Sequence, residues 1–244
     1  FWAVVLVLLK LWLIAHLPIR ASTAGYDNLR YVILAHNFLQ PPPAYDSLVL
    51  VRQPGYPFFI VLSYYLHIPL RFAQELLYLA SGWFLADAID RRYLAKLASR
   101  ILFALYVFAP FSFHWNRQTI QEVLYLPLTA IIFGCLIHLL ETQTNRGLFG
   151  WSLLLGMVLA WFWYTRLEGV WILPAIALTY LLLLYRNLRS YATDNRESAF
   201  AKYNIPSIGF SIACVFVPVL VVTSSISLSH YFQYGLYDTN DLKS

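Results

Sequence analysis

Long apolar runs are the feature of this sequence that most constrains its fold. Hydrophobic residues make up 60% of its 244 positions and charged residues 12%. A soluble domain averages about 45–50% and about 25%, respectively. A membrane-spanning helix needs roughly 17–25 mostly apolar residues. The stretches that approach this length are 1–19, 72–90, 100–113, 123–140, 149–165, 169–186 and 207–228. The sequence therefore predicts an all-α, polytopic membrane domain with about seven spans.

This composition excludes several classes of protein. A chain this apolar is neither a soluble globular domain nor a disordered segment, and its mean hydropathy of +0.60 agrees. Its net charge of +5 belongs to the flanks of membrane helices, so we expect no nucleic-acid partner. Cys135 and Cys214 lie inside apolar runs and indicate no disulfide framework. Because the chain begins at Phe1 and its one methionine is Met157, we expect a fragment that lacks its natural start. We expect 1–244 to be a membrane domain from the N-terminal part of a longer protein.

The basic residues predict which ends of the spans face the cytoplasm. Nine of the 17 Lys and Arg residues lie in three short connectors: 91–100, 141–148 and 186–206. Short cytoplasmic loops are enriched in Lys and Arg, so we expect these connectors and the N-terminus to be cytoplasmic. The non-cytoplasmic face would then hold the remaining connectors and the tail: 20–71, 114–122, 165–168 and 229–244.

The first outer loop, residues 20–71, is longer than most connections and is therefore a candidate functional segment. Apolar residues after Asp27 recur with helical spacing, which predicts an amphipathic helix lying on the membrane surface. Arg52 then precedes a Gln-Pro-Gly-Tyr-Pro turn. The apolar stretch 57–69 has only 13 residues, so we expect it to be re-entrant or interfacial rather than spanning.

Two polar turns interrupt the apolar runs on the same predicted face. Glu122 opens the fourth run, and Arg166 and Glu168 lie in a tight turn between the fifth and sixth. Ionisable residues at membrane depth cost about 2.5–3.5 kcal/mol each on insertion scales, so they are usually paired or functional. We expect Arg166 and Glu168 to act as one unit.

Four motifs on this face together resemble the GT-C membrane glycosyltransferases. These are the polyprenyl-phosphate-sugar-dependent enzymes related to protein O-mannosyltransferases and lipid A aminoarabinose transferases. The motifs are Asp27-x-x-Arg-Tyr-x-x-x-Ala, Arg52-x-Pro-Gly-Tyr56-Pro, Glu122-x-x-Tyr-x-Pro and Thr-Arg166-x-Glu168-Gly. They occur in the family's order, and the match covers most of the chain. O-mannosyltransferases carry a second acid directly after the first, whereas this chain has Asn28 at that position. This difference argues against the O-mannosyltransferase branch and leaves the identity of the acceptor open.

The resemblance implies a multi-pass enzyme with its active site on the non-cytoplasmic side. It would move a hexosyl or pentosyl group, with inversion, from a polyprenyl-phosphate sugar to a lipid, glycan or protein acceptor. Asp27 and Glu122 would be the catalytic residues, with Asp27 the general base. The substrate-binding residues would be Arg52, Tyr56, Arg166 and Glu168. Membrane lipids are the other partners that we expect.

Sequence motifs for cofactors are missing, and we expect neither a cofactor nor a metal. The histidines have no close metal-ligand spacing. There is no Walker sequence, no GxGxxG and no Asp-x-Asp pair that would support a cytoplasmic nucleotide-sugar site. This absence favours a donor that is linked to a lipid.

Each candidate residue also has a structural interpretation. Asp27 could cap a helix, and Arg52 could snorkel to lipid phosphates. Glu122 could be an acid that starts a span, and the pair Arg166–Glu168 could serve architecture. A multi-span transporter or lipid flippase is the alternative function, although no paired repeat supports it. A second alternative is a catalytically silent assembly subunit.

Overall fold

The structure is a computed structural model that describes residues 2–17, 19, 26–40, 53–91, 96–192, 205–235 and 237. The side chains of residues 26, 27, 167, 168, 190–192, 205, 233 and 234 are not described. Across these ranges the regular elements are α-helices and one 3-10 helix, with no strand. The predicted all-α class is therefore confirmed.

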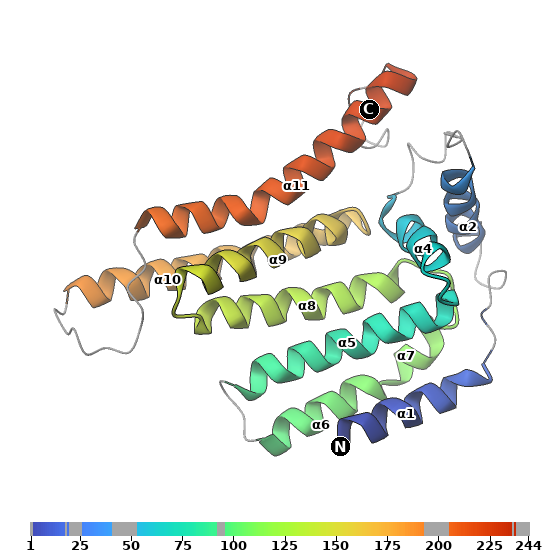
Figure 1. The fold of residues 1–244 in the computed structure, drawn as a ribbon, viewed down its shortest axis with the longest axis horizontal. Helices are drawn as coiled ribbons and strands as arrows, with labels where there is room; N and C mark the ends of the chain where they lie inside the picture. Colours follow the sequence, from blue (N-terminus) through green and yellow to red (C-terminus); the bar gives the residue numbers. More distant parts are fainter. Residues whose placement is uncertain are drawn as a thin grey trace.

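A bundle of roughly parallel and antiparallel helices forms the body of the molecule (Figure 1). Its members are α1 (Trp2–Ala15), α5 (Leu70–Asp90), α6 (Lys96–Val107), α8 (Glu122–Glu141), α9 (Asn145–Trp163), α10 (Leu173–Ala192) and α11 (Ile205–Tyr234). The shorter helices α2 (Tyr26–Leu39), α4 (Gly55–Tyr65) and α7 (Pro110–Trp115) lie at one end of this bundle (Figure 1). A 3-10 helix, η1 (Leu167–Ile172), joins α9 to α10.

Among the described residues, five helical segments are long and apolar enough to cross a membrane. They are Lys96–Trp115, Glu122–Glu141, Asn145–Trp163, Gly169–Arg189 and Pro206–Phe232. The chain thus has the helices of a multi-pass membrane protein, but the predicted count of about seven spans is not confirmed. Helix α1 has only 14 residues. Helix α5 has 21 residues, and its apolar character is reduced by Arg71, Gln74, Glu75, Asp87 and Asp90.

Helix α4 occupies most of the stretch that we predicted to be re-entrant or interfacial. It has 11 residues, which is too short to span a bilayer. The turn that follows places His67 in the left-handed region, at a φ of 57°, and Pro69 then precedes α5. This tight turn sends the chain directly back into the bundle.

The ends of the helices fall into two groups. Helices α5, α8 and α10 finish at one end of the bundle, where α6, α9 and α11 begin (Figure 1). The three basic connectors therefore all lie at one end of the bundle. Helices α2, α4 and α7 lie at the opposite end. This agrees with the predicted division of connectors between two faces. That the basic end is cytoplasmic stays a prediction.

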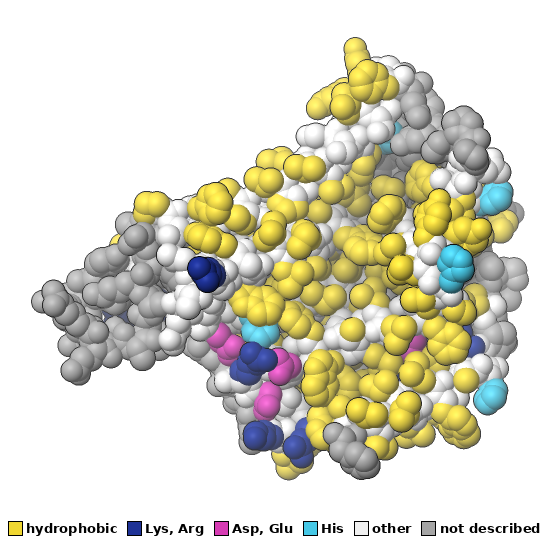
Figure 2. Space-filling model, viewed as in Figure 1, with side chains coloured by type: hydrophobic (Ala, Val, Ile, Leu, Met, Phe, Trp, Pro, Cys, Tyr) yellow, Lys and Arg dark blue, Asp and Glu magenta, His cyan; other side chains and the backbone are white. Residues whose placement is uncertain are grey.

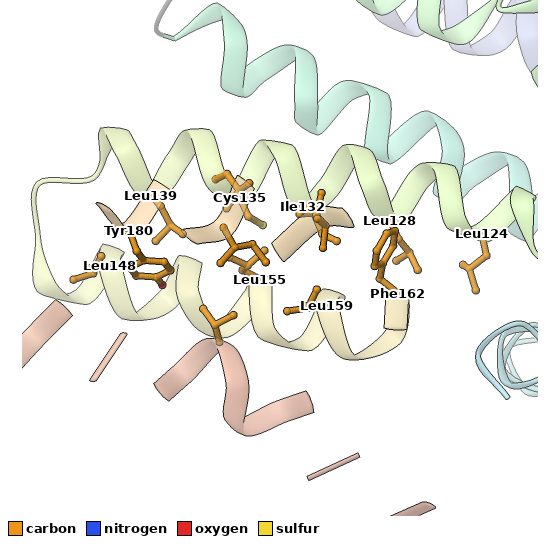
Figure 3. Close-up of a cluster of buried hydrophobic side chains, with 14 of the residues drawn as sticks. Leu124, Leu128, Ile132, Cys135, Leu139, Leu148, Leu155, Leu159, Phe162 and Tyr180 are labelled. Atoms are coloured by element: carbon orange, nitrogen blue, oxygen red, sulfur yellow. The ribbon is translucent and has the colours of Figure 1, made fainter. Parts of the chain in front are cut away.

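The largest core lies between α8, α9, α10 and α11 (Figure 3). Ile132 and Leu139 of α8 pack there with Leu155 of α9 and Tyr180 of α10. The outer surface is also apolar: hydrophobic side chains cover most of the helical face drawn in Figure 2, and charged ones gather near the ends of α5 and α8. A protein that is apolar both inside and outside suits a hydrocarbon environment.

Helices α9 and α11 approach closely at Gly156. A Cβ atom on this glycine would lie 2.5 Å from the carbonyl oxygen of Val215 and 3.0 Å from Cγ of Pro218. Small residues allow such close approach of membrane helices. Pro218 lies inside α11, whose direction changes along its length (Figure 1), as expected where a proline removes a helical hydrogen bond. The C-terminal half of α11 diverges from α9.

Candidate functional site

The first turn of α2, which contains Asp27, is held against the turn that follows α7. The Thr119 hydroxyl donates to the carbonyl oxygen of Asn28 at 3.2 Å, and the Tyr31 hydroxyl donates to Oε1 of Gln121 at 2.8 Å. The backbone of Asp27 is therefore close to the residues that lead into α8 at Glu122. The carboxylate of Asp27 lies outside the described side chains, so its predicted catalytic role is not tested.

Gly55 attaches α4 to the end of α9. Its N–H donates to the carbonyl oxygen of Tyr164 at 2.7 Å, and its own carbonyl accepts from Nε1 of Trp161 at 2.9 Å. A Cβ atom at this position would lie 2.5 Å from the Tyr164 oxygen. Only glycine fits this contact without a shift of the backbone, which gives the Pro-Gly-Tyr-Pro motif a structural reason. Arg52, at the start of the motif, lies outside the described residues.

Tyr56, which the resemblance places in substrate binding, is fully buried. Its hydroxyl accepts a hydrogen bond from Nε2 of Gln74 at 2.6 Å, and its ring meets Tyr31 edge-to-face at 5.4 Å. Burial raises the pKa of this hydroxyl well above its ordinary value, so the group stays neutral. These contacts join α2, α4 and α5, and they give Tyr56 a positioning role. Direct contact with a substrate stays a prediction.

Arg166 is paired with Glu122. Its Nη1 atom lies 3.4 Å from Oε1 of Glu122, and both side chains are about one-third exposed, at 32% and 31%. The guanidinium also lies over the ring of Tyr125, 5.5 Å from the centroid. The predicted partner was Glu168, whose side chain is not described. The structure thus brings together two predicted site residues that the sequence analysis assigned to separate turns.

Tyr125 is itself fixed from two sides. Its ring stacks on Phe162 with centroids 4.4 Å apart, and its hydroxyl accepts from Nε1 of Trp171 at 2.5 Å. The platform beneath Arg166 is therefore built from α8, α9 and η1. This rigidity limits where the Arg166 guanidinium can go.

A buried ion pair lies deeper, between α1 and α5. Lys10 Nζ is 3.8 Å from Oε1 of Glu75, and neither side chain is exposed. Lys10 also donates to the Ser112 hydroxyl at 2.7 Å, and Asn116 donates from Nδ2 to Oε2 of Glu75 at 2.5 Å. Lys10 interrupts the first apolar run, and the structure places its side chain inside the bundle. Glu75 was missed, although an acid inside the predicted run 72–90 was the available signal.

An apolar groove of about 710 Å³ runs between α2, α4, α9 and α11. Phe38, Phe58 and Met157 are among the residues that line it, together with Val221 on the diverging part of α11. Gly55 and Tyr164 also line it, so the groove reaches the place where α4 meets the end of α9. Its lining can hold a hydrocarbon chain by burial of apolar surface.

Within the described ranges, no group of three or more His, Cys, Asp or Glu residues could hold a metal ion. Comparison of the chain with models of protein families, with curated proteins and with solved structures finds no match. The function is therefore argued from the geometry of this end of the bundle and from the resemblance of the motifs.

Proposed function

We propose that this chain is the membrane domain of a glycosyltransferase that uses a polyprenyl-phosphate sugar as donor. One observation carries the proposal: an apolar groove reaches the same end of the bundle as the first turn of α2 and the Glu122–Arg166 pair. A polyprenyl-phosphate sugar has the matching arrangement of a long hydrocarbon chain, a phosphate and a polar sugar. The groove would hold the chain, and the polar end would hold the phosphate and the sugar.

In the proposed reaction, Asp27 removes the proton from the acceptor hydroxyl as general base. The acceptor oxygen forms a bond to the anomeric carbon from the side opposite the phosphate, and the bond between that carbon and the phosphate oxygen breaks. Polyprenyl phosphate leaves with the electron pair, and the configuration at the anomeric carbon is inverted. Arg166, oriented by Glu122, and Arg52 stabilise the negative charge that grows on the phosphate.

Positioning supplies much of the proposed rate. A carboxylate is a weak base near neutral pH, so it must be held within hydrogen-bond reach of the acceptor hydroxyl. The first turn of α2 is suitable because Asn28 and Tyr31 are hydrogen-bonded to the turn between α7 and α8. Asp46, the nearest other acid in this loop, lies outside the described residues.

The test is transfer of label from radiolabelled polyprenyl-phosphate sugars in membranes that contain the full-length protein. Asp27→Asn keeps the shape and most of the helix-capping capacity, and should lower turnover by about 10²–10⁴-fold at normal membrane yield. Asp46→Asn is the matched control and should leave transfer unchanged. Near-normal transfer by a well-folded Asp27→Asn protein would mean that Asp27 is only a helix cap.

A second test separates the transferase from the alternative flippase. Val221 lines the groove and is 58% exposed, whereas its neighbour Leu220 is 61% exposed and does not line it. Val221→Trp should weaken use of long-chain donors more than short-chain donors, and Leu220→Trp should not. If no donor yields labelled product while labelled lipid crosses proteoliposome bilayers, the chain moves lipids and the transferase proposal fails.

A further inference from the structure

At the α4 end of the bundle, the described positively charged side chains outnumber the described carboxylates that neutralise them. Asn116 binds Glu75, and Nε2 of Gln74 lies 3.5 Å from the carbonyl oxygen of Gln118. These contacts fix the first turns of α5 against the turn after α7. Arg71 lies one helical turn before Glu75, and Arg117 directly follows Asn116. Burial lowers the pKa of Arg71, and the positive charge of Arg117 lowers it further.

Glu75 is the carboxylate nearest to these cations along α5, and its oxygens already have partners. It pairs with Lys10 and accepts from Asn116. It also attracts Arg71, but it cannot neutralise Lys10, Arg71 and Arg117 together. Lys10 and Glu75 are fully buried, and Arg71 and Arg117 are partly buried, so uncompensated charge is costly here.

The two arginines also have unused hydrogen-bond donors. Nη2 of Arg71 and Nε of Arg117 are both buried, and neither has a hydrogen-bond partner among the described residues. Neither guanidinium forms an ion pair within 4.0 Å with a described carboxylate. Arg71 lies in the first turn of α5, where the helix dipole also favours an anion.

We propose that Arg71 and Arg117 together bind a phosphate group at this end of the bundle. Phosphate offers several acceptor oxygens and negative charge, which match two guanidinium forks in geometry and in sign. The phosphate belongs either to a lipid in the same leaflet or to a free phosphate compound. The proposal involves neither Arg52 nor Arg166 and does not require that the chain transfers sugar.

Protection of wild-type arginines from an arginine-specific reagent tests the proposal without any mutation. The full-length protein in nanodiscs is treated with phenylglyoxal, and peptide mass spectrometry measures modification of each arginine. Polyprenyl phosphate or phosphatidylglycerol should protect Arg71 and Arg117, whereas polyprenol and diacylglycerol should not. Arg146, exposed in the first turn of α9, should be modified equally in every sample. Protection by inorganic phosphate alone would assign a free phosphate compound.

Binding by variants gives an independent measurement. The double variant Arg71→Gln, Arg117→Gln should bind the protecting phosphate compound at least about tenfold more weakly, because it loses charged hydrogen bonds. Arg146→Gln removes one positive charge at the basic end and should bind as the wild type does. Equal modification of Arg71 and Arg117 with and without every phosphate compound would overturn the proposal, and so would unchanged binding by a folded double variant. Neither result depends on transferase activity, so failure here leaves the proposed function untouched.

Discussion

Nη1 of Arg166 lies 3.4 Å from Oε1 of Glu122, and this pair joins the turn after α9 to the first turn of α8. The contact links two of the four motifs that carry the family resemblance. Both side chains are about one-third exposed, at 32% and 31%, so the pair should add little to stability, about 0–1 kcal/mol. Its consequence is geometric, because it orients Arg166 above Tyr125.

The first prediction tests which acid, Glu122 or Glu168, acts together with Arg166. In a double-mutant cycle, Glu122→Gln and Arg166→Met should show non-additive effects on transfer, because each single change already breaks their contact. Thermal unfolding should change little in all three variants. Glu168→Gln combined with Arg166→Met is the comparison cycle. Additive losses for Glu122 together with coupling for Glu168 would restore the pairing first predicted from the sequence.

The second prediction concerns the buried pair of Lys10 and Glu75. Removal of one partner leaves an uncompensated buried charge, so Lys10→Met should cost about 3–5 kcal/mol of stability. It should therefore lower the unfolding temperature and the folded yield in detergent. Lys10→Met with Glu75→Gln should be milder than the single change. A double variant as unstable as the sum of both singles would show that the pair is not coupled.

The third prediction concerns the contact between α4 and α9. Gly55→Ala places a Cβ atom 2.5 Å from the backbone oxygen of Tyr164, so α4 must move away from α9. We expect a lower unfolding temperature and reduced donor use, since Gly55 also lines the groove. Gly150→Ala is the control, because its Cβ meets nothing within 4 Å and α9 gains a better helix former. Equal stability of the two variants would contradict the close contact.

The fourth prediction tests the two ends of the bundle. Single cysteines at Asn145 and His114, in a background without Cys135 and Cys214, should react with an impermeant reagent from opposite sides of the membrane. Both positions are exposed, and they lie in α9 and α7 at opposite ends of the bundle. Labelling of Asn145 and His114 from one side would refute the assigned membrane arrangement.

The apolar runs by themselves determined the all-α class and the positions of the five described helices that are long and apolar enough to span a membrane. This was possible because length and composition decide whether a helix can cross a bilayer, whatever its neighbours are. The predicted count of about seven spans is not confirmed, and α5 is one reason, because it carries Glu75 and other polar residues within its apolar run. The sequence also predicted that the stretch 57–69 is too short to span, and α4 has 11 residues.

Only the tertiary structure decided which polar residues meet. Arg166 contacts Glu122, which belongs to a different turn of the sequence, and Lys10 of α1 contacts Glu75 of α5. The reason is physical: spacing along the chain fixes which residues share a helix face, whereas helix packing fixes which faces touch. The orphan donors of Arg71 and Arg117 became visible for the same reason, since burial is a property of the assembled bundle.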